Sequence, residues 1–490
     1  METEQRTKYT YPMIALTTLF FMWGFITCMN DILIPYLRKM FDLQRWESML
    51  VQFTFFTAYF VGSLVYFILS VRKGDPIAKR GYKNGILLGL FISAGACLLI
   101  YPAAALQSFP LFLSALFILG LGFTLLQIAA NPYVALLGKP ETASSRLNLS
   151  QAFNSFGTTI APILGGFLVF DFFAKVGNPL IGRTGNIISN DMGSPLSAAS
   201  VQLPYLIFAA VFVALAVVFY LIKLPEFSAS AKIEKGVGAL RFKQLYLGMI
   251  AIFVYVGAEV AVGSSFINYA KESLDMPEMK AKAFLAFYWG GLMIGRFLGS
   301  ISLSGISSTR KYLIMLLVSV LTFFVIYGAN YFVMNYFEGQ QGLGIEEVAP
   351  YLIFVFVNYL GFILGKSMPA RTLMIFSLIA IILLGIALAS SGIHTFWTII
   401  GLGLFNSIMW SNIFALSIAG LGKDTAQGSS LLVMMILGGA VVPMIVGAFA
   451  DIIGGYHYAF FVPIICYGYL AYYGWKGYKP KYKHSENITA

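Results

Sequence analysis

Long apolar stretches separated by short polar segments run along nearly the whole chain. A helix needs about 20 apolar residues to cross about 30 Å of hydrocarbon, because backbone groups left unpaired in lipid cost several kcal/mol each. The pattern therefore predicts an all-α polytopic membrane protein with fourteen spans. We expect them at about residues 12–36, 49–71, 84–104, 109–137, 147–171, 203–223, 244–268, 281–303, 312–333, 349–365, 372–391, 397–421, 428–450 and 457–475.

Composition and charge agree with this reading. Of the 490 residues 59% are hydrophobic and only 11% are charged, where soluble domains carry about 25%. The net charge of +11 does not indicate nucleic-acid binding, since the basic residues lie between the apolar stretches. Most of them fall in alternate loops, which predicts a multi-pass protein of the cell (inner) membrane with both termini in the cytoplasm. Cys28, Cys97 and Cys466 show no metal-binding or disulfide spacing, so we expect no cofactor and no structural metal.

Weak internal symmetry links the two halves of the chain. At a shift of 281 residues Asn131 matches Asn412 and Gly157 matches Gly438, whereas Gly24 matches Gly257 at a shift of 233. The difference predicts an inserted piece, and its length suits a helical hairpin. We expect a six-helix bundle at residues 1–223, a cytoplasmic linker at 224–243, and a second bundle at 244–490 with an extra hairpin at about 310–370. Chance matches among 48 glycines are the alternative.

Three ionisable residues stand out inside the predicted spans, away from the terminal residues of each span, where such a residue costs at least about 2.5 kcal/mol. Asp31 and Glu259 occupy similar positions on the first helix of each half, so they are expected to face one another across the repeat interface. A carboxylate there can take up a proton or bind sodium, which favours cation coupling. Arg296 lies near the inner end of the eighth span and is predicted to act in gating. The alternative for each carboxylate is a buried group satisfied by static donors.

Amides and aromatic residues gather in the same spans. Gln127 and Asn131 share one helix face, and so do Gln151 and Asn154 on the next span. Amides pair with sugar hydroxyls while aromatic rings cover the apolar faces of a sugar, so the pattern indicates a sugar site. Amides also join membrane helices to one another, which is the alternative for any single one. Further candidates for the site are Tyr288, Trp289, Asn406, Ser407, Trp410 and Asn412.

Several of these segments resemble one known family. Residues 119–166, together with FMWGFITCMNDILIP, YVGAEVAVGSSFINY and YWGGLMIGRFLGS, are similar to the fucose/glucose/galactose symporter family of the major facilitator superfamily. The resemblance implies a twelve-helix core and inward sugar transport driven by a cation gradient. It also implies that Asp31 couples the cation and that Asn154 contacts sugar. Gln127 stands where fucose members carry glutamate, and Glu259 where they carry glutamine, so the acid has moved between halves.

The sequence thus predicts a hexose:cation symporter that works as a monomer, with alternating access. Gln127, Asn131, Gln151, Asn154, Glu259, Trp289, Asn406, Trp410 and Asn412 would contact a glucose- or galactose-like sugar, and Na⁺ or H⁺ would bind at Asp31, with Glu259 as a second coupling group. One rival is a drug or other small-solute:proton antiporter of the same superfamily. An enzyme acting on lipid-linked substrates is disfavoured, because His394, His457 and His484 have no paired ligand spacing.

Overall fold

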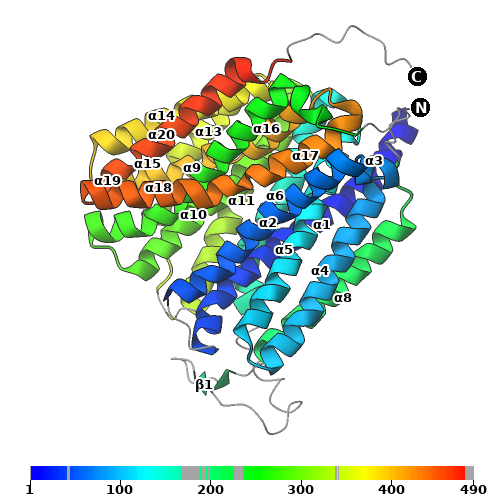
Figure 1. Ribbon diagram of the computed structural model, residues 1–490. Coiled ribbons are helices and arrows are strands. Elements are labelled where there is room, and N and C mark those ends of the chain that lie inside the picture. Colours follow the sequence, from blue (N-terminus) through cyan, green and yellow to red (C-terminus); the bar gives the residue numbers. More distant parts are fainter. Residues whose placement is uncertain are drawn as a thin grey trace.

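The computed structural model describes residues 2–40, 45–166, 188–189, 195–196, 199–225, 235–336, 339 and 341–480. This part of the chain is helical apart from its loops and one short antiparallel pair, β1 (Ile188–Ser189) and β2 (Pro195–Leu196). Figure 1 shows the helices of the first half, from blue through cyan to green at α8, beside those of the second half, from green at α9 and α10 through yellow to red. The prediction of an all-helical membrane fold is confirmed.

The first half is built from seven helices and a 3-10 turn in the described residues. They are α1 (Glu2–Met40), α2 (Arg45–Lys73), α3 (Pro76–Arg80), α4 (Tyr82–Ala105), α5 (Phe109–Leu136), η1 (Pro140–Thr142), α6 (Ala143–Gly166) and α8 (Ala199–Leu221). Pro76 begins α3 after Asp75, whose carboxylate accepts hydrogen bonds from the Ile77 and Ala78 amides and so caps the helix.

The second half begins with η3 (Gly238–Arg241), α9 (Lys243–Leu274), α10 (Glu278–Ser302), α11 (Ser308–Tyr336), α12 (Ile345–Val348), α13 (Tyr351–Gly365) and α14 (Pro369–Ala389). It continues with α15 (Ile393–Asn406), α16 (Met409–Ile418), η4 (Gly422–Asp424), α17 (Thr425–Met434), η5 (Met435–Leu437), α18 (Gly438–Ile453), α19 (Tyr456–Ala459), α20 (Phe461–Tyr472) and the π-helical turn η6 (Tyr473–Gly477). Residues 222–242 join the halves, and we call their side of the bundle the inner side and the opposite one the outer side.

Helices occupy all fourteen predicted positions, but only eleven within the described residues are long and apolar enough to cross a membrane by themselves. The count of fourteen spans is therefore not confirmed. Physical reasons account for the difference. Helix α6 carries Arg146, Asn148, Gln151 and Asn154, which lower its hydropathy; α13 has 15 residues, and α20 has 12 before η6 begins.

Two close helix crossings occupy equivalent positions in the two halves. Where α1 crosses α6, a Cβ on Gly24 would meet the Asn154 carbonyl oxygen at 2.1 Å, and one on Gly157 would meet the Phe21 carbonyl oxygen at 2.3 Å. Where α9 crosses α18, a Cβ on Gly438 would meet the Phe253 carbonyl oxygen at 1.9 Å. Only glycine permits such an approach. These crossings explain the glycine matches at both sequence shifts.

Helices α11, α12 and α13 pack on the outside of α10 and α15. Polar side chains hold them: Asn330 Nδ2 donates to the Ala283 carbonyl at 2.9 Å, and Asn358 Nδ2 donates to the Leu404 carbonyl at 2.9 Å. On the outer side the Lys280 and Glu347 side chains form an exposed ion pair at 2.6 Å. On the inner side Lys311 Nζ donates to the Ser302 carbonyl at 2.9 Å. The segment is therefore attached to the bundle at both ends.

Candidate functional site

A buried polar network surrounds Glu259 in the middle of the second half. The Tyr255 hydroxyl, one turn earlier on α9, donates to Glu259 Oε1 at 2.7 Å, and the Tyr288 hydroxyl of α10 donates to the Glu259 carbonyl at 2.8 Å. Asn406 Nδ2 then donates to the Tyr288 hydroxyl at 3.0 Å, while Tyr467 of α20 donates to Asn406 Oδ1 at 2.8 Å. Side chains of four helices therefore form one hydrogen-bonded network around Glu259, with Tyr255 as the donor to its carboxylate.

Glu259 is the member of the network that keeps some exposure. Its side chain is 9% exposed, whereas the three tyrosines and Asn406 are at most 1% exposed. Arg296 lies close enough to interact with it electrostatically. A buried carboxylate with a fixed donor on one oxygen can still accept a hydrogen bond from a small polar ligand.

Polar groups of the first half are tied to neighbouring helices. Gln127 is buried on α5 and interacts with the Tyr59 hydroxyl of α2, as does Trp23 of α1. Asn154 Nδ2 donates to the Phe20 carbonyl at 3.0 Å, so this amide joins α6 to α1. Gln151, one helical turn inward of Asn154, is buried at 7% exposure.

The two tryptophan candidates have different surroundings. Trp289 on α10 is 38% exposed, and its ring lies over Gly263 of α9, where a Cβ would meet it at 2.7 Å. Trp410 on α16 is 7% exposed and stacks on Phe414 with ring centroids 6.1 Å apart. Trp289 is therefore the more exposed of the two rings, while Trp410 is packed among other side chains.

Hydrogen bonds join the two halves on the inner side. Arg296 Nη1 of α10 donates to Ser155 Oγ of α6 at 2.5 Å, and its Nε donates to the Ser407 carbonyl at 3.2 Å. Nearer the inner ends, Ser145 Oγ donates to the Ser300 carbonyl at 2.6 Å. Gln427 at the start of α17 donates to Ser70 Oγ of α2 at 3.0 Å, and Asn148 donates to Asn412. In this conformation the inner side is closed.

Comparison with known proteins identifies the family. The model of the Major Facilitator Superfamily matches residues 13–436. The chain belongs to this superfamily. It is 40% identical to the glucose/galactose transporter of Brucella abortus, over 98% of this chain and 97% of that one. It is 29% identical to the L-fucose-proton symporter of Escherichia coli, over 94% and 92% of the two chains.

A solved structure of a member of this superfamily has the same fold. The E. coli fucose:proton symporter FucP, in the outward conformation, matches with a TM-score of 0.70 at 28% identity, covering 96% of this chain and 99% of that one. The predicted resemblance to the fucose, glucose and galactose transporters is confirmed.

The remaining candidates differ in their surroundings. Asn406 and Asn412 are fully buried and bind other protein groups, Asn406 in the Glu259 network and Asn412 through the Pro369 carbonyl at 3.1 Å. Asn131 is also fully buried, but neither atom of its amide has a protein partner. Asp31 lies on α1, and its side chain falls outside the part of the structure that is described. Its predicted coupling role stays a prediction.

Three residues of the candidate site were not predicted from the sequence: Tyr255 and Tyr467 in the Glu259 network, and Ser155, which binds Arg296. Tyr255 precedes Glu259 by four residues and so shares its helix face, a signal that the spacing contains. Tyr467 and Ser155 gave no such signal, because α20 and α6 meet their partners only in the folded bundle.

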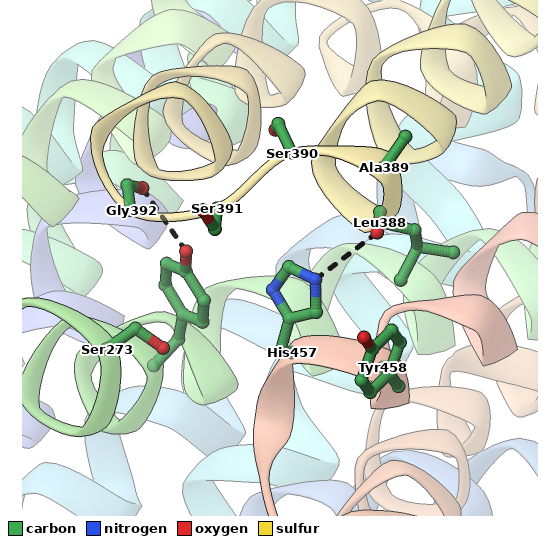
Figure 2. A pocket seen from close by; sticks show the side chains of 9 residues that line it. Ser273, Leu388, Ala389, Ser390, Ser391, Gly392, His457 and Tyr458 are labelled. Atoms are coloured by element: carbon green, nitrogen blue, oxygen red, sulfur yellow. Dashed lines mark hydrogen bonds between the residues drawn. The ribbon is translucent and has the colours of Figure 1, made fainter.

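A depression of about 520 Å³ lies apart from the Glu259 network, on the outer side of the second half (Figure 2). His457 Nε2 is 3.3 Å from the Leu388 carbonyl, and the Tyr269 hydroxyl donates to the Gly392 carbonyl at 3.2 Å. Its other polar side chains are Ser273, Ser390, Ser391 and Tyr458. None of the residues predicted from the sequence to contact substrate lines it.

Proposed function

We propose that this protein imports a glucose- or galactose-like hexose by cation symport with alternating access. The observation that carries the proposal is the Glu259 network, in which the Tyr255 hydroxyl donates to the carboxylate, the Tyr288 hydroxyl donates to the backbone carbonyl, and the residue keeps 9% exposure in the middle of α9. Such an arrangement is expensive in a membrane protein and is suited to a polar solute. The similarity to the Brucella glucose/galactose transporter supports the sugar class.

In this proposal the sugar lies between the halves. Glu259 accepts hydrogen bonds from sugar hydroxyls while Gln127 and Gln151 approach from the opposite side. Trp289, whose ring is partly exposed, covers an apolar sugar face. Asn154 lies near the same level and fixes α6 against α1.

Asp31 would carry the coupling cation, Na⁺ or H⁺, in the first half. The surroundings of a carboxylate at this level of α1 would change when the halves close. Protonation or sodium binding neutralises its charge. Glu259 would communicate with it through the bound sugar. No reaction is catalysed, so the protein is not an enzyme.

We further propose a core of twelve helices with α11 to α13 as an added hairpin. Packing supports this division: α1 with α6, α4 with α5 and α4 with α8 have the counterparts α9 with α18, α14 with α15 and α14 with α20, when α11 and α13 are left out. With the inner side in the cytoplasm, the chain would function as a monomer in the cell (inner) membrane.

Counterflow in proteoliposomes tests the function. Vesicles loaded with glucose or galactose should accumulate labelled hexose transiently, and replacement of sodium by choline at two pH values should identify the ion. Exchange of lipophilic cations but of no hexose would favour the antiporter alternative instead.

A further inference from the structure

Four polar side chains lie at one depth on the inner side of the bundle. They are Asn131 on α5, Asn148 on α6, Asn412 on α16 and Ser429 on α17, and all are 0% exposed. Each stands four to six residues from the inner end of its helix, which corresponds to about 6 to 9 Å. They form a layer one helical turn inward of Gln127.

The internal repeat relates these side chains in pairs. A shift of 281 residues converts Asn131 to Asn412 and also Asn148 to Ser429. In the structure α6 packs against α16, and α5 packs against α17. Asn148 and Asn412 meet at the first of these junctions, and the repeat assigns Asn131 and Ser429 to the second as their counterparts.

The two junctions differ in their hydrogen bonds. At the first, Asn148 Nδ2 donates to Asn412 Oδ1 at 3.2 Å, and Asn412 Nδ2 donates to the Pro369 carbonyl. At the second, Asn131 Nδ2, Asn131 Oδ1 and Ser429 Oγ are all buried without a protein partner. A serine reaches less far than the asparagine that its repeat counterpart carries, although at the first junction Asn148 Oδ1 is also buried without a protein partner.

Buried polar groups without partners destabilise the arrangement that buries them. The closed inner side is therefore held together at the α6–α16 junction and weakened at the α5–α17 junction. Opening would let both amide atoms of Asn131 and the Ser429 hydroxyl bind hydroxyl groups, one turn from Gln127.

We propose that the inner side opens at the α5–α17 junction and that Asn131 and Ser429 there form an exit subsite for the hydroxyl groups of the leaving sugar. The subsite rests on the proposed transport function, whereas the direction of opening can be measured without any sugar.

The distance between the halves tests the proposal. Spin labels at the exposed positions Lys139→Cys, just after α5, and Ala419→Cys, in the loop before α17, report the separation at this junction in full-length protein whose Cys28, Cys97 and Cys466 are replaced. Ser429→Asn supplies the longer side chain of its repeat counterpart and should lower the fraction of widely separated molecules about threefold or more. Asn131→Leu removes the unpaired amide at similar volume and should act in the same direction. Asn148→Leu, the matched control, should raise that fraction.

The outcomes separate the claims. The proposal is overturned when Asn131→Leu leaves the distances unchanged or shifts them in the same direction as Asn148→Leu, and this variant decides alone when Ser429→Asn does not fold. For the subsite, Asn131→Leu should slow hexose efflux by a larger factor than it lowers the widely separated fraction; equal factors would reject the subsite. Distance shifts as expected without any hexose transport would retain the opening direction and reject the proposed function.

Discussion

The two halves of the site are organised differently. In the second half, Glu259 and Asn406 are bound by tyrosines from α9, α10 and α20, so polar side chains satisfy one another. In the first half, Asn154 binds a backbone carbonyl and Asn131 binds nothing in the protein. The second half thus holds its carboxylate in a preorganised position, whereas the first half retains polar groups that can change partners.

We therefore expect the second half to contribute most to sugar recognition and the first half to cation coupling. Variants in either half test this contrast, and the expected effects decrease from Asp31 through Glu259 and Tyr255 to Asp75.

The largest effect should come from Asp31→Asn in the first half. It should abolish uphill accumulation while sparing sugar exchange, because an amide neither takes up a proton nor supplies a carboxylate for sodium. Gradient-driven uptake and exchange are measured in the same vesicles. Uptake driven fully by the gradient in this variant would show that the coupling group lies elsewhere.

Glu259→Gln should raise the half-saturation concentration for hexose about tenfold or more. Hydrogen bonds to a charged group contribute about 1.5 to 3 kcal/mol, and a neutral amide would also weaken the hydrogen bond that the Tyr255 hydroxyl donates to Glu259. Sugar binding to purified protein measures the effect directly. An unchanged constant and unchanged ion dependence would remove Glu259 from the site and with it the contrast between halves.

Tyr255→Phe should weaken sugar binding less, by about threefold to tenfold, since one neutral donor to Glu259 is lost at nearly constant volume. Tyr269→Phe is the matched control, because its hydroxyl donates to a carbonyl at the outer depression. Binding titrations of both variants suffice. Equal losses in the two would indicate a general packing defect rather than loss of preorganisation.

The smallest effect concerns Asp75, on the inner side outside the membrane-spanning segments. Burial raises the pKa of this carboxyl above its usual 3.8, although the Tyr66 hydroxyl donates to it at 2.6 Å. A raised acid pKa means that the closed inner side favours the protonated form, so closure should weaken as pH rises through that pKa. Asp75→Asn keeps the helix cap and should remove this dependence.

Spin-label distances at pH 4, close to the ordinary pKa, and at pH 8 measure it, with an expected change of about threefold or less. A pH response that persists in Asp75→Asn would assign it to another group.

Much of the fold was predictable because apolar length and glycine spacing are local properties of the sequence. The fourteen helix positions, the α1–α6 and α9–α18 crossings and the polar content of α6 all follow from such patterns. Whether a helix spans the bilayer alone was not predictable for α6, since its polar side chains are satisfied by other helices.

The site was predicted in part for a similar reason. Glu259 was identified because an acid in an apolar stretch is expensive, and Tyr255 could have been found from its spacing. The sequence predicts sugar contacts for Asn406 and Asn412, which stay predictions; in the structure these amides bind tyrosines, Asn148 and a backbone carbonyl. The partners of an amide depend on which helices meet, which one sequence does not reveal.

The polar character of α6 also bears on how the chain enters the bilayer during synthesis. An insertion machinery that sorts segments by hydropathy would insert this helix into the membrane with low efficiency. Its tight glycine contact with α1 and the Asn154 bond to the Phe20 carbonyl provide the compensating partner. Helix α1 must then already lie in the membrane when α6 is inserted. Removing α1 should therefore leave α6 in the aqueous phase.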